Sequence, residues 1–146
     1  MGSRSVRNTA MDLLSRRDHS RKQLIGKLQQ RGFETEEILQ SLDLLERENL
    51  LNDERFAESY LHQRMQRGFG PIRIRQELEE RGVSSEIVQS LMASCEGLWS
   101  DLMQQQRIKR FGEEIPQDYK EKTKQARFLQ NRGFSPEAVM RLFREP

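Results

Sequence analysis

The sequence has little of what catalytic and membrane proteins are usually built from. It contains one cysteine and two histidines among 146 residues, and aromatic residues make up only 7%. A single cysteine excludes an internal disulfide framework, and no group of cysteine, histidine and carboxylate residues has the spacing of metal ligands. No apolar run approaches the length that spans a membrane, so we expect a cytoplasmic protein.

Catalytic motifs are also missing. The stretch Gly68-Phe69-Gly70-Pro71 is rich in glycine, but it lacks the Lys-Ser/Thr pair of a phosphate-binding loop. Most carboxylates lie at helical spacing from arginines, which favours a solvated surface over a paired acid and base. We therefore expect a protein that is not an enzyme and that uses no cofactor and no metal.

What the chain does contain is a hexapeptide that occurs three times. The copies begin at Leu28, Leu78 and Leu129, and each reads Leu-x-x-Arg-Gly followed by Phe or Val. Their glycines are 50 and 51 residues apart. A fixed period of this length indicates one supersecondary unit that is used three times. The arginine falls in a last helical turn, where a cation complements the helix dipole, and the glycine can take the left-handed conformation that closes a helix.

The apolar residues of every periodic segment have helical spacing, and no segment alternates with a period of two. Ser20 with Gln23 three residues later is a capping-box pattern, Thr35 is the expected cap of the next helix, and Asn52 or Asp53 that of the one after. The sequence therefore predicts an all-α protein of nine helices. We expect three tandem three-helix repeats, resembling helix-turn-helix units, in an elongated and curved body. The predicted repeats are residues 4–50, 51–96 and 97–146.

Positive charge is concentrated around one predicted break between helices. Arg64, Arg67, Arg73 and Arg75 lie in a stretch, residues 63–76, that contains no acid. Arginine makes bidentate contacts with phosphate and carboxylate groups, and a helix that begins at Pro71 would offer amides to an anion. We predict a site for DNA phosphate or an acidic protein surface, with these residues: Arg64, Arg67, Gly68, Gly70, Pro71, Arg73, Arg75, Arg21 and Lys22. The alternative is a basic loop whose arginines pair with acids of neighbouring repeats.

Several of these stretches resemble the RecX family, the regulatory proteins of the bacterial RecA recombinase. The resemblance covers nearly the whole chain in order, with its most specific stretch in the centre. The matching residues are Asp18-His19-Ser20 with Leu24, Lys27 and Leu28; Asn52-Asp53 with Arg55, Phe56 and Ala57; Gly68, Gly70, Pro71, residues 73–78 and Gly82; and Arg110-Phe111-Gly112, Arg127-Phe128-Leu129 and Arg132-Gly133-Phe134.

The resemblance implies a function that the composition alone does not predict. Proteins of this family bind the filament that RecA forms on single-stranded DNA and lodge in its groove. They inhibit the recombinase, ATPase and coprotease activities of RecA by blocking or reversing filament growth, in homologous recombination, DNA repair and the SOS response. The expected partners are thus RecA and single-stranded DNA, directly or within the filament, and no membrane. We expect a monomer.

A helix-turn-helix protein that binds DNA on its own is the alternative. A recognition helix usually offers Asn, Gln or Arg side chains to base edges. The third predicted helix of the first repeat instead carries Glu36, Glu37, Asp43 and Glu46, which phosphates would repel. The sequence therefore favours a protein that regulates a nucleoprotein filament.

Overall fold

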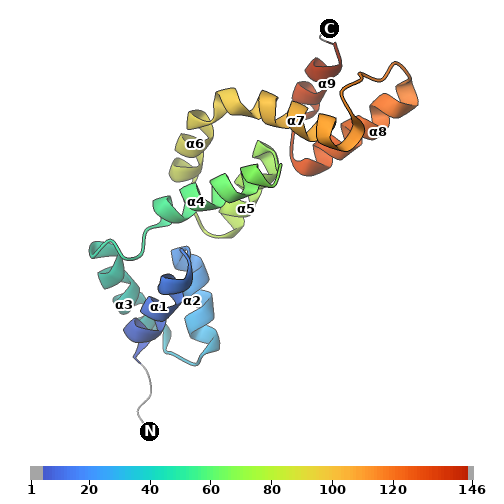
Figure 1. The fold of residues 1–146 in the computed structure, drawn as a ribbon. Helices are drawn as coiled ribbons and strands as arrows, with labels where there is room; N and C mark the ends of the chain where they lie inside the picture. The colour runs from blue at the N-terminus through green and yellow to red at the C-terminus, as the bar shows by residue number, and fades with distance from the viewer. Residues whose placement is uncertain (1–4, 145–146) are drawn as a thin grey trace. The chain divides into compact units, whose positions relative to one another are not determined.

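The computed structural model describes residues 5–144, which form helices joined by short turns (Figure 1). The prediction of an all-α chain of three-helix units is confirmed, since these residues contain nine α-helices, a short 3₁₀ helix and no strand. Arg4 and residues 145–146, at the ends of the predicted repeats, lie outside the described residues. The helices are α1 (Val6–Arg16), α2 (Arg21–Gln30), α3 (Thr35–Arg47), α4 (Asp53–Gln66), α5 (Pro71–Glu80), α6 (Ser85–Ser94), η1 (Glu96–Leu98), α7 (Trp99–Phe111), α8 (Tyr119–Arg132) and α9 (Pro136–Arg144).

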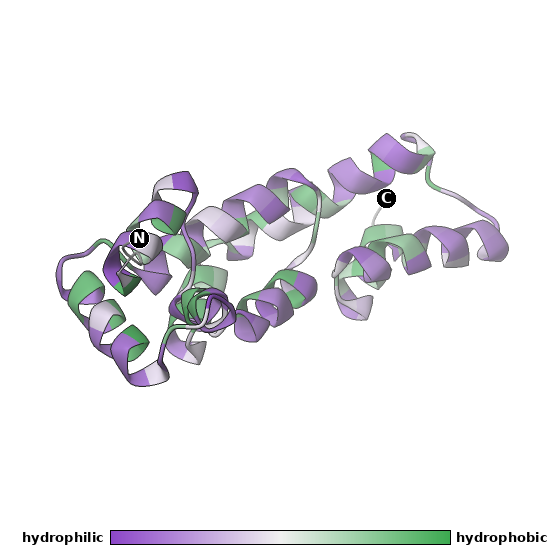
Figure 2. Cartoon of the chain, turned by 90° about the horizontal axis from the view of Figure 1, so that it is seen from below, coloured by the Kyte–Doolittle hydropathy of each residue, from purple (hydrophilic) through white to green (hydrophobic). Residues whose placement is uncertain are grey.

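The helices divide into two compact units. Among the described residues, the first comprises 5–60 together with 78–87, and the second comprises 61–77 together with 88–144. Apolar and hydrophilic residues alternate along the helices, as the green and purple stretches in Figure 2 show. In the first unit the buried core consists of Val6, Ala10, Leu13, Leu24, Leu28, Ile38, Leu42, Leu45 and Leu51. In the second unit it includes Met103, Leu129, Phe134 and Val139. The repeat boundaries and the elongated shape stay predictions.

The repeated hexapeptide closes three helices in the same way. After α2, the amide of Phe33 donates to the carbonyl of Leu28 at 3.3 Å and the amide of Gly32 donates to that of Gln29 at 3.0 Å. These two bonds form a Schellman motif, which needs a left-handed residue. Gly32, Gly82 and Gly133 have φ angles of 88°, 83° and 107°, so the predicted conformation is confirmed.

The end of α3 uses the same motif without glycine. Asn49 has a φ of 61°, and the amide of Leu50 donates to the carbonyl of Leu45 at 2.9 Å. Asparagine tolerates this conformation better than other residues that carry a Cβ atom. The sequence pattern did not single out Asn49.

The predicted helix starts are confirmed in part. Ser20 and Gln23 form a complete capping box on α2. Asn52 caps α4 by accepting a hydrogen bond from the amide of Arg55 at 2.9 Å. The expectation for Thr35 is wrong, because Thr35 is the first residue of α3 and the preceding Glu34 makes no side-chain cap.

In the first unit, the start of α2 packs against the end of α5. The hydroxyl of Ser20 donates to the carbonyl of Arg81 at 2.6 Å, and Nζ of Lys22 donates to that of Glu80 at 3.1 Å. The side chain of Lys22 packs against Gly82. If residue 82 carried a Cβ atom, that atom would lie only 2.6 Å from the Cβ of Lys22. We call this a start-to-end contact, because the first residues of one helix satisfy the last carbonyls of another.

The second unit repeats the start-to-end contact with backbone donors. The amide of Gly70, before α5, donates to the carbonyl of Arg132 at 2.8 Å, and the amide of Ile72 donates to that of Gly133 at 3.0 Å. The Cβ of Arg73 lies 2.5 Å from where a Cβ on Gly133 would be, so only glycine fits there. The amides at the start of α5, which have no hydrogen-bond partner within that helix, thus donate to the free carbonyls at the end of α8. The positive end of one helix dipole therefore lies against the negative end of the other, which is favourable.

The start-to-end contact predicts that two equivalent glycines differ in importance. Gly82→Ala and Gly32→Ala both place a Cβ on a left-handed residue, which costs about 1–3 kcal/mol. Nothing lies within 4 Å of a Cβ at Gly32, whereas one at Gly82 would clash with Lys22. We expect Gly82→Ala to lower the free energy of unfolding in urea by at least about 1 kcal/mol more than Gly32→Ala. Equal losses would show that the contact between α2 and α5 is easily rearranged.

His19 lies in the turn between α1 and α2, where its ring is 3% exposed. Its Nδ1 donates a hydrogen bond to the carbonyl of Arg17 at 3.1 Å, because a carbonyl oxygen can only accept. Burial lowers the pKa of the His19 imidazole below its usual 6.5, and the charge of Arg17 adds to this effect. The fold therefore favours the neutral form of His19 over the charged form.

This burial predicts a loss of stability in acid. Because the pKa is lower in the folded state, the unfolded chain takes up the proton first, so the stabilisation is complete above pH 6.5 and is lost as the pH falls below it. Asparagine keeps a donor near the Nδ1 position but does not titrate. We expect urea unfolding of His19→Asn to depend less on pH below 6.5 than that of the parent. The exposed His62 gives the control, His62→Asn; an unchanged pH dependence in His19→Asn would contradict the prediction.

Candidate partner-binding surface

The predicted basic break lies between α4 and α5, and its arginines gather around one aromatic ring. The guanidinium carbons of Arg64, Arg73 and Arg132 lie 3.9, 4.4 and 4.9 Å from the centre of the Phe69 ring. Each position allows a cation–π interaction. The break therefore brings together a residue of the third repeat, Arg132, with two of the predicted site residues.

Glu77 of α5 compensates two of these arginines. Its carboxylate accepts two hydrogen bonds from Arg64, at 2.9 and 2.8 Å, and one from Arg73 at 3.3 Å. The side chains of Arg64 and Glu77 are only 17% and 16% exposed. Arg64 and Arg73 thus pair with an acid of their own repeat, and they hold α4 and α5 together around Phe69.

The two glycines of the break and the start of α5 have structural roles as well. Gly68 is left-handed with a φ of 87°, and Gly70 lies so close to Gly133 that a Cβ would be 2.6 Å from its carbonyl. The amides of Gly70 and Ile72 donate to the end of α8. The expectation that amides beside Pro71 face an external anion is therefore wrong.

Arg21 and Lys22 are likewise engaged within the fold. Arg21 forms ion pairs with Asp43, at 2.9 Å, and with Glu46, both in α3. Its amide donates to Asp53 at 2.8 Å, and Lys22 contributes to the start-to-end contact. Two acids of α3, Asp43 and Glu46, thus compensate a cation that was predicted to bind phosphate.

Arg67 and Arg75 are the predicted arginines that remain available. Both are exposed, and no hydrogen bond or ion pair holds either side chain among residues 5–144. The carbonyl of Arg67 accepts a hydrogen bond from Arg132 at 3.2 Å, which fixes the backbone beneath its side chain. The cluster thus separates into a compensated part, Arg64 and Arg73, and a solvent-facing part, Arg67 and Arg75.

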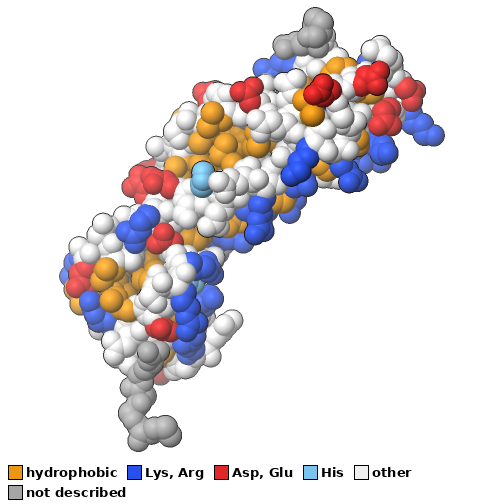
Figure 3. Space-filling model, viewed as in Figure 1, with side chains coloured by type: hydrophobic (Ala, Val, Ile, Leu, Met, Phe, Trp, Pro, Cys, Tyr) orange, Lys and Arg blue, Asp and Glu red, His pale blue; other side chains and the backbone are white. Residues whose placement is uncertain are grey.

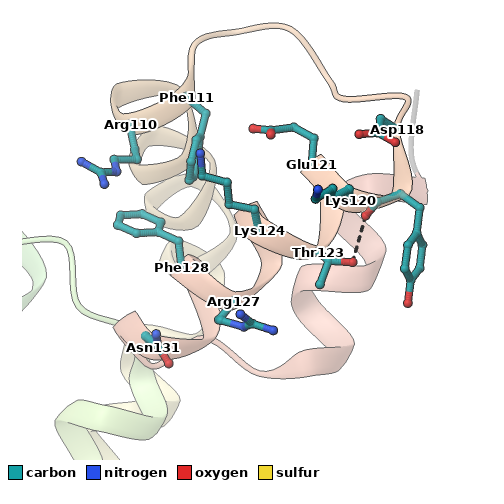
Figure 4. Close-up of a pocket in the computed structure, with 11 residues that line it drawn as sticks. Arg110, Phe111, Asp118, Lys120, Glu121, Thr123, Lys124, Arg127, Phe128 and Asn131 are labelled. Carbon is teal, nitrogen blue, oxygen red and sulfur yellow. Dashed lines mark hydrogen bonds between the residues drawn. The ribbon is translucent and has the colours of Figure 1, made fainter.

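A second basic surface, which the sequence did not single out, lies in the third repeat. A groove of about 960 Å³ runs between the end of α7 and one face of α8 (Figure 4). We call it the α7–α8 groove, and its lining residues are Arg110, Phe111, Asp118, Tyr119, Lys120, Glu121, Thr123, Lys124, Arg127, Phe128 and Asn131. The available signal was the helical spacing of Lys120, Lys124 and Phe128, which places them on one side of α8.

The described surface offers charged groups that can bind a partner. Within residues 5–144, no group of three or more His, Cys, Asp and Glu side chains could hold a metal ion. None of the helices described is both long and apolar enough to cross a bilayer. Figure 3 shows Lys and Arg side chains exposed on the face that it presents. Such side chains are suited to phosphate or carboxylate groups.

Comparison with known proteins gives the same family over the three repeats. Models for the first, second and third three-helix domains of RecX match residues 7–45, 52–92 and 100–143. The regulatory protein RecX of Pseudomonas fluorescens strain SBW25 is 43% identical over 138 residues, which cover 94% of this chain and 89% of that protein. The regulatory protein RecX of Halorhodospira halophila is 40% identical over 137 residues, covering 94% and 85%.

Solved structures agree on the fold. The crystal structure of RecX from Lactobacillus salivarius superposes with a TM-score of 0.78 at 22% identity, covering 95% of this chain and 94% of that one. A crystal structure of regulatory protein RecX gives a TM-score of 0.79 at 21% identity, covering 97% and 72%. With the sequence relatives, these matches show that the chain belongs to the RecX family of regulatory proteins.

Proposed function

We propose that this protein binds the filament that RecA forms on single-stranded DNA and inhibits the recombinase, ATPase and coprotease activities of RecA. In this proposal it lodges in the filament groove as a monomer and blocks or reverses filament growth in the cytoplasm. Membership of the RecX family is the observation that carries the proposal. The sensitive test is whether substoichiometric protein suppresses ATP hydrolysis by RecA on single-stranded DNA.

The charged surface supports a partner of this kind. A filament groove presents both protein and DNA phosphate, and exposed arginines can make bidentate contacts with either. Among the described residues, no hydrogen bond or ion pair occupies the guanidinium groups of Arg67 and Arg75. We therefore assign them, rather than Arg64 and Arg73, as contacts to the filament.

The third helices of the repeats argue against a helix-turn-helix protein that reads DNA alone. In such proteins the first residues of the recognition helix contact base edges. Here the first turns of all three helices are acidic: α3 carries Glu36 and Glu37 there, α6 carries Glu86 and α9 carries Glu137. Each helix would bring carboxylates to the floor of a phosphate-lined groove, which is unfavourable.

The division of the basic cluster into a compensated part and a solvent-facing part gives a specific prediction. Arg67→Ala with Arg75→Ala should change the free energy of unfolding by no more than about 0.5 kcal/mol per site, because both side chains are exposed. The same pair should weaken binding to RecA-coated single-stranded DNA severalfold, at up to about 1 kcal/mol per lost charged contact. Fluorescence anisotropy with a labelled filament measures the affinity, and ATP hydrolysis measures inhibition.

A matched control removes the same charge elsewhere. Arg31 and Arg47, at the ends of α2 and α3, are also exposed, so Arg31→Ala with Arg47→Ala has the same effect on net charge. We expect this control to bind and inhibit like the parent. If both pairs weaken binding equally, Arg67 and Arg75 act only through net charge and are not specific contacts.

A further inference from the structure

The cations of the α7–α8 groove form a row along α8. Lys120, Lys124 and Arg127 are spaced i, i+4 and i+7, so they follow one face with a rise of about 6 Å and then about 4.5 Å. All three are exposed, and no hydrogen bond or ion pair holds them among the described residues. A row of cations on one helix face is suited to a nucleic-acid backbone, which carries its phosphates in a regular row.

The two carboxylates that line the groove serve the fold. Oε1 of Glu121 accepts a hydrogen bond from the Gln125 amide at 3.3 Å, and Oε1 of Gln125 accepts one from Arg107 at 3.4 Å. Asp118 stands at the N-cap of α8, where a negative charge complements the helix dipole. Glu121 is thus hydrogen-bonded to its own helix, while Arg110 lies against the Phe128 ring and the lining cations Lys120, Lys124 and Arg127 are exposed.

Aromatic rings accompany these cations. Tyr119 is 83% exposed, although a large apolar ring gains stability from burial. The rings of Phe111 and Phe128 meet edge to face at 5.4 Å, at one end of the groove (Figure 4). An exposed aromatic beside a row of cations is the combination that binds single-stranded nucleic acid, because every base has a face that can stack.

The groove is formed before any ligand arrives. Arg107 is 1% exposed, and its guanidinium donates to the carbonyls of Gly112, Glu113 and Glu114 in the loop that joins α7 to α8. These bonds fix the loop and so the separation of the two helices. A preformed site avoids the entropy cost of ordering a loop on binding.

We propose that the α7–α8 groove binds a single strand of nucleic acid, with its phosphates along Lys120, Lys124 and Arg127 and a base stacked on Tyr119. The inference rests on the proposed function, which supplies such a strand within the filament. A duplex is a poorer ligand for this groove, because its bases are already stacked and paired. The inference assigns the third repeat to the strand, whereas Arg67 and Arg75 belong to the second.

The test measures binding of a fluorescein-labelled oligothymidylate to the full chain, without RecA, by anisotropy at several salt concentrations. Tyr119→Ala should weaken binding by about fivefold to a hundredfold, which is about 1–3 kcal/mol at 1.4 kcal/mol per factor of ten, and Tyr119→Phe should retain it. Lys124→Ala with Arg127→Ala should lower the slope of log affinity against log salt by about 1.4. Thermal melts followed by circular dichroism check that each variant is folded.

Two controls match these changes. Lys109→Ala with Arg141→Ala removes two exposed cations of the same unit outside the groove, and Met140→Ala removes an apolar side chain that is 53% exposed. Both controls should bind the oligothymidylate like the parent. The assignment is wrong if the groove variants also do so, if the Lys109 and Arg141 control loses as much affinity, or if Tyr119→Ala weakens binding of a duplex equally.

The outcome is separable from that of the proposed function. If the groove variants lose the oligothymidylate but the parent fails to slow ATP hydrolysis by RecA, the groove assignment stands and the proposed function is wrong. If all variants inhibit RecA and bind the oligothymidylate like the parent, the groove assignment is wrong and the proposed function stands.

Discussion

The structure depends on the contact between the start of one helix and the glycine-closed end of another. Every helix leaves amides without partners at its start and carbonyls without partners at its end. Here the first residues of α2 meet the end of α5, and those of α5 meet the end of α8. Within each unit, this contact holds two helices together by hydrogen bonds. It thereby adds to the stability that the small hydrophobic cores provide.

The same contact explains why a basic cluster contains two kinds of arginine. Arg73 is drawn into the fold because its Cβ packs on Gly133 and its guanidinium donates to the carbonyl of Asn131 at 3.3 Å. Two residues further on, Arg75 is exposed to solvent and makes no such contact. Charge density in a sequence therefore overstates the surface that a partner can reach, and the difference lies in which face of α5 each side chain occupies.

Local signals in the sequence were sufficient for the nine α-helices of the described residues and for many of their ends, but not for the start of α3 at Thr35. The Leu-x-x-Arg-Gly step and the capping box at Ser20 act over five residues or fewer, so they can be read directly. Asn49 was missed because asparagine signals a left-handed turn more weakly than glycine. The sharing of Glu77 between Arg64 and Arg73, and the groove between α7 and α8, depend on how separate helices pack. No pattern within a single helix reports such pairings.

Gly133 has a consequence for how the chain can change by mutation. A Cβ at this position would collide with the backbone of Arg73 as well as with its side chain, so no change of side chain at Arg73 would make room. At Gly82 the three nearest atoms all belong to the side chain of Lys22, and the nearest is its Cβ at 2.6 Å, so only glycine at position 22 would remove the clash. A residue with a Cβ atom at position 82 would thus require a change to glycine at position 22, in addition to the strain of a left-handed backbone. The contact between the second and third repeats offers no such route, and tolerates no substitution for Gly133 unless the helices themselves move apart.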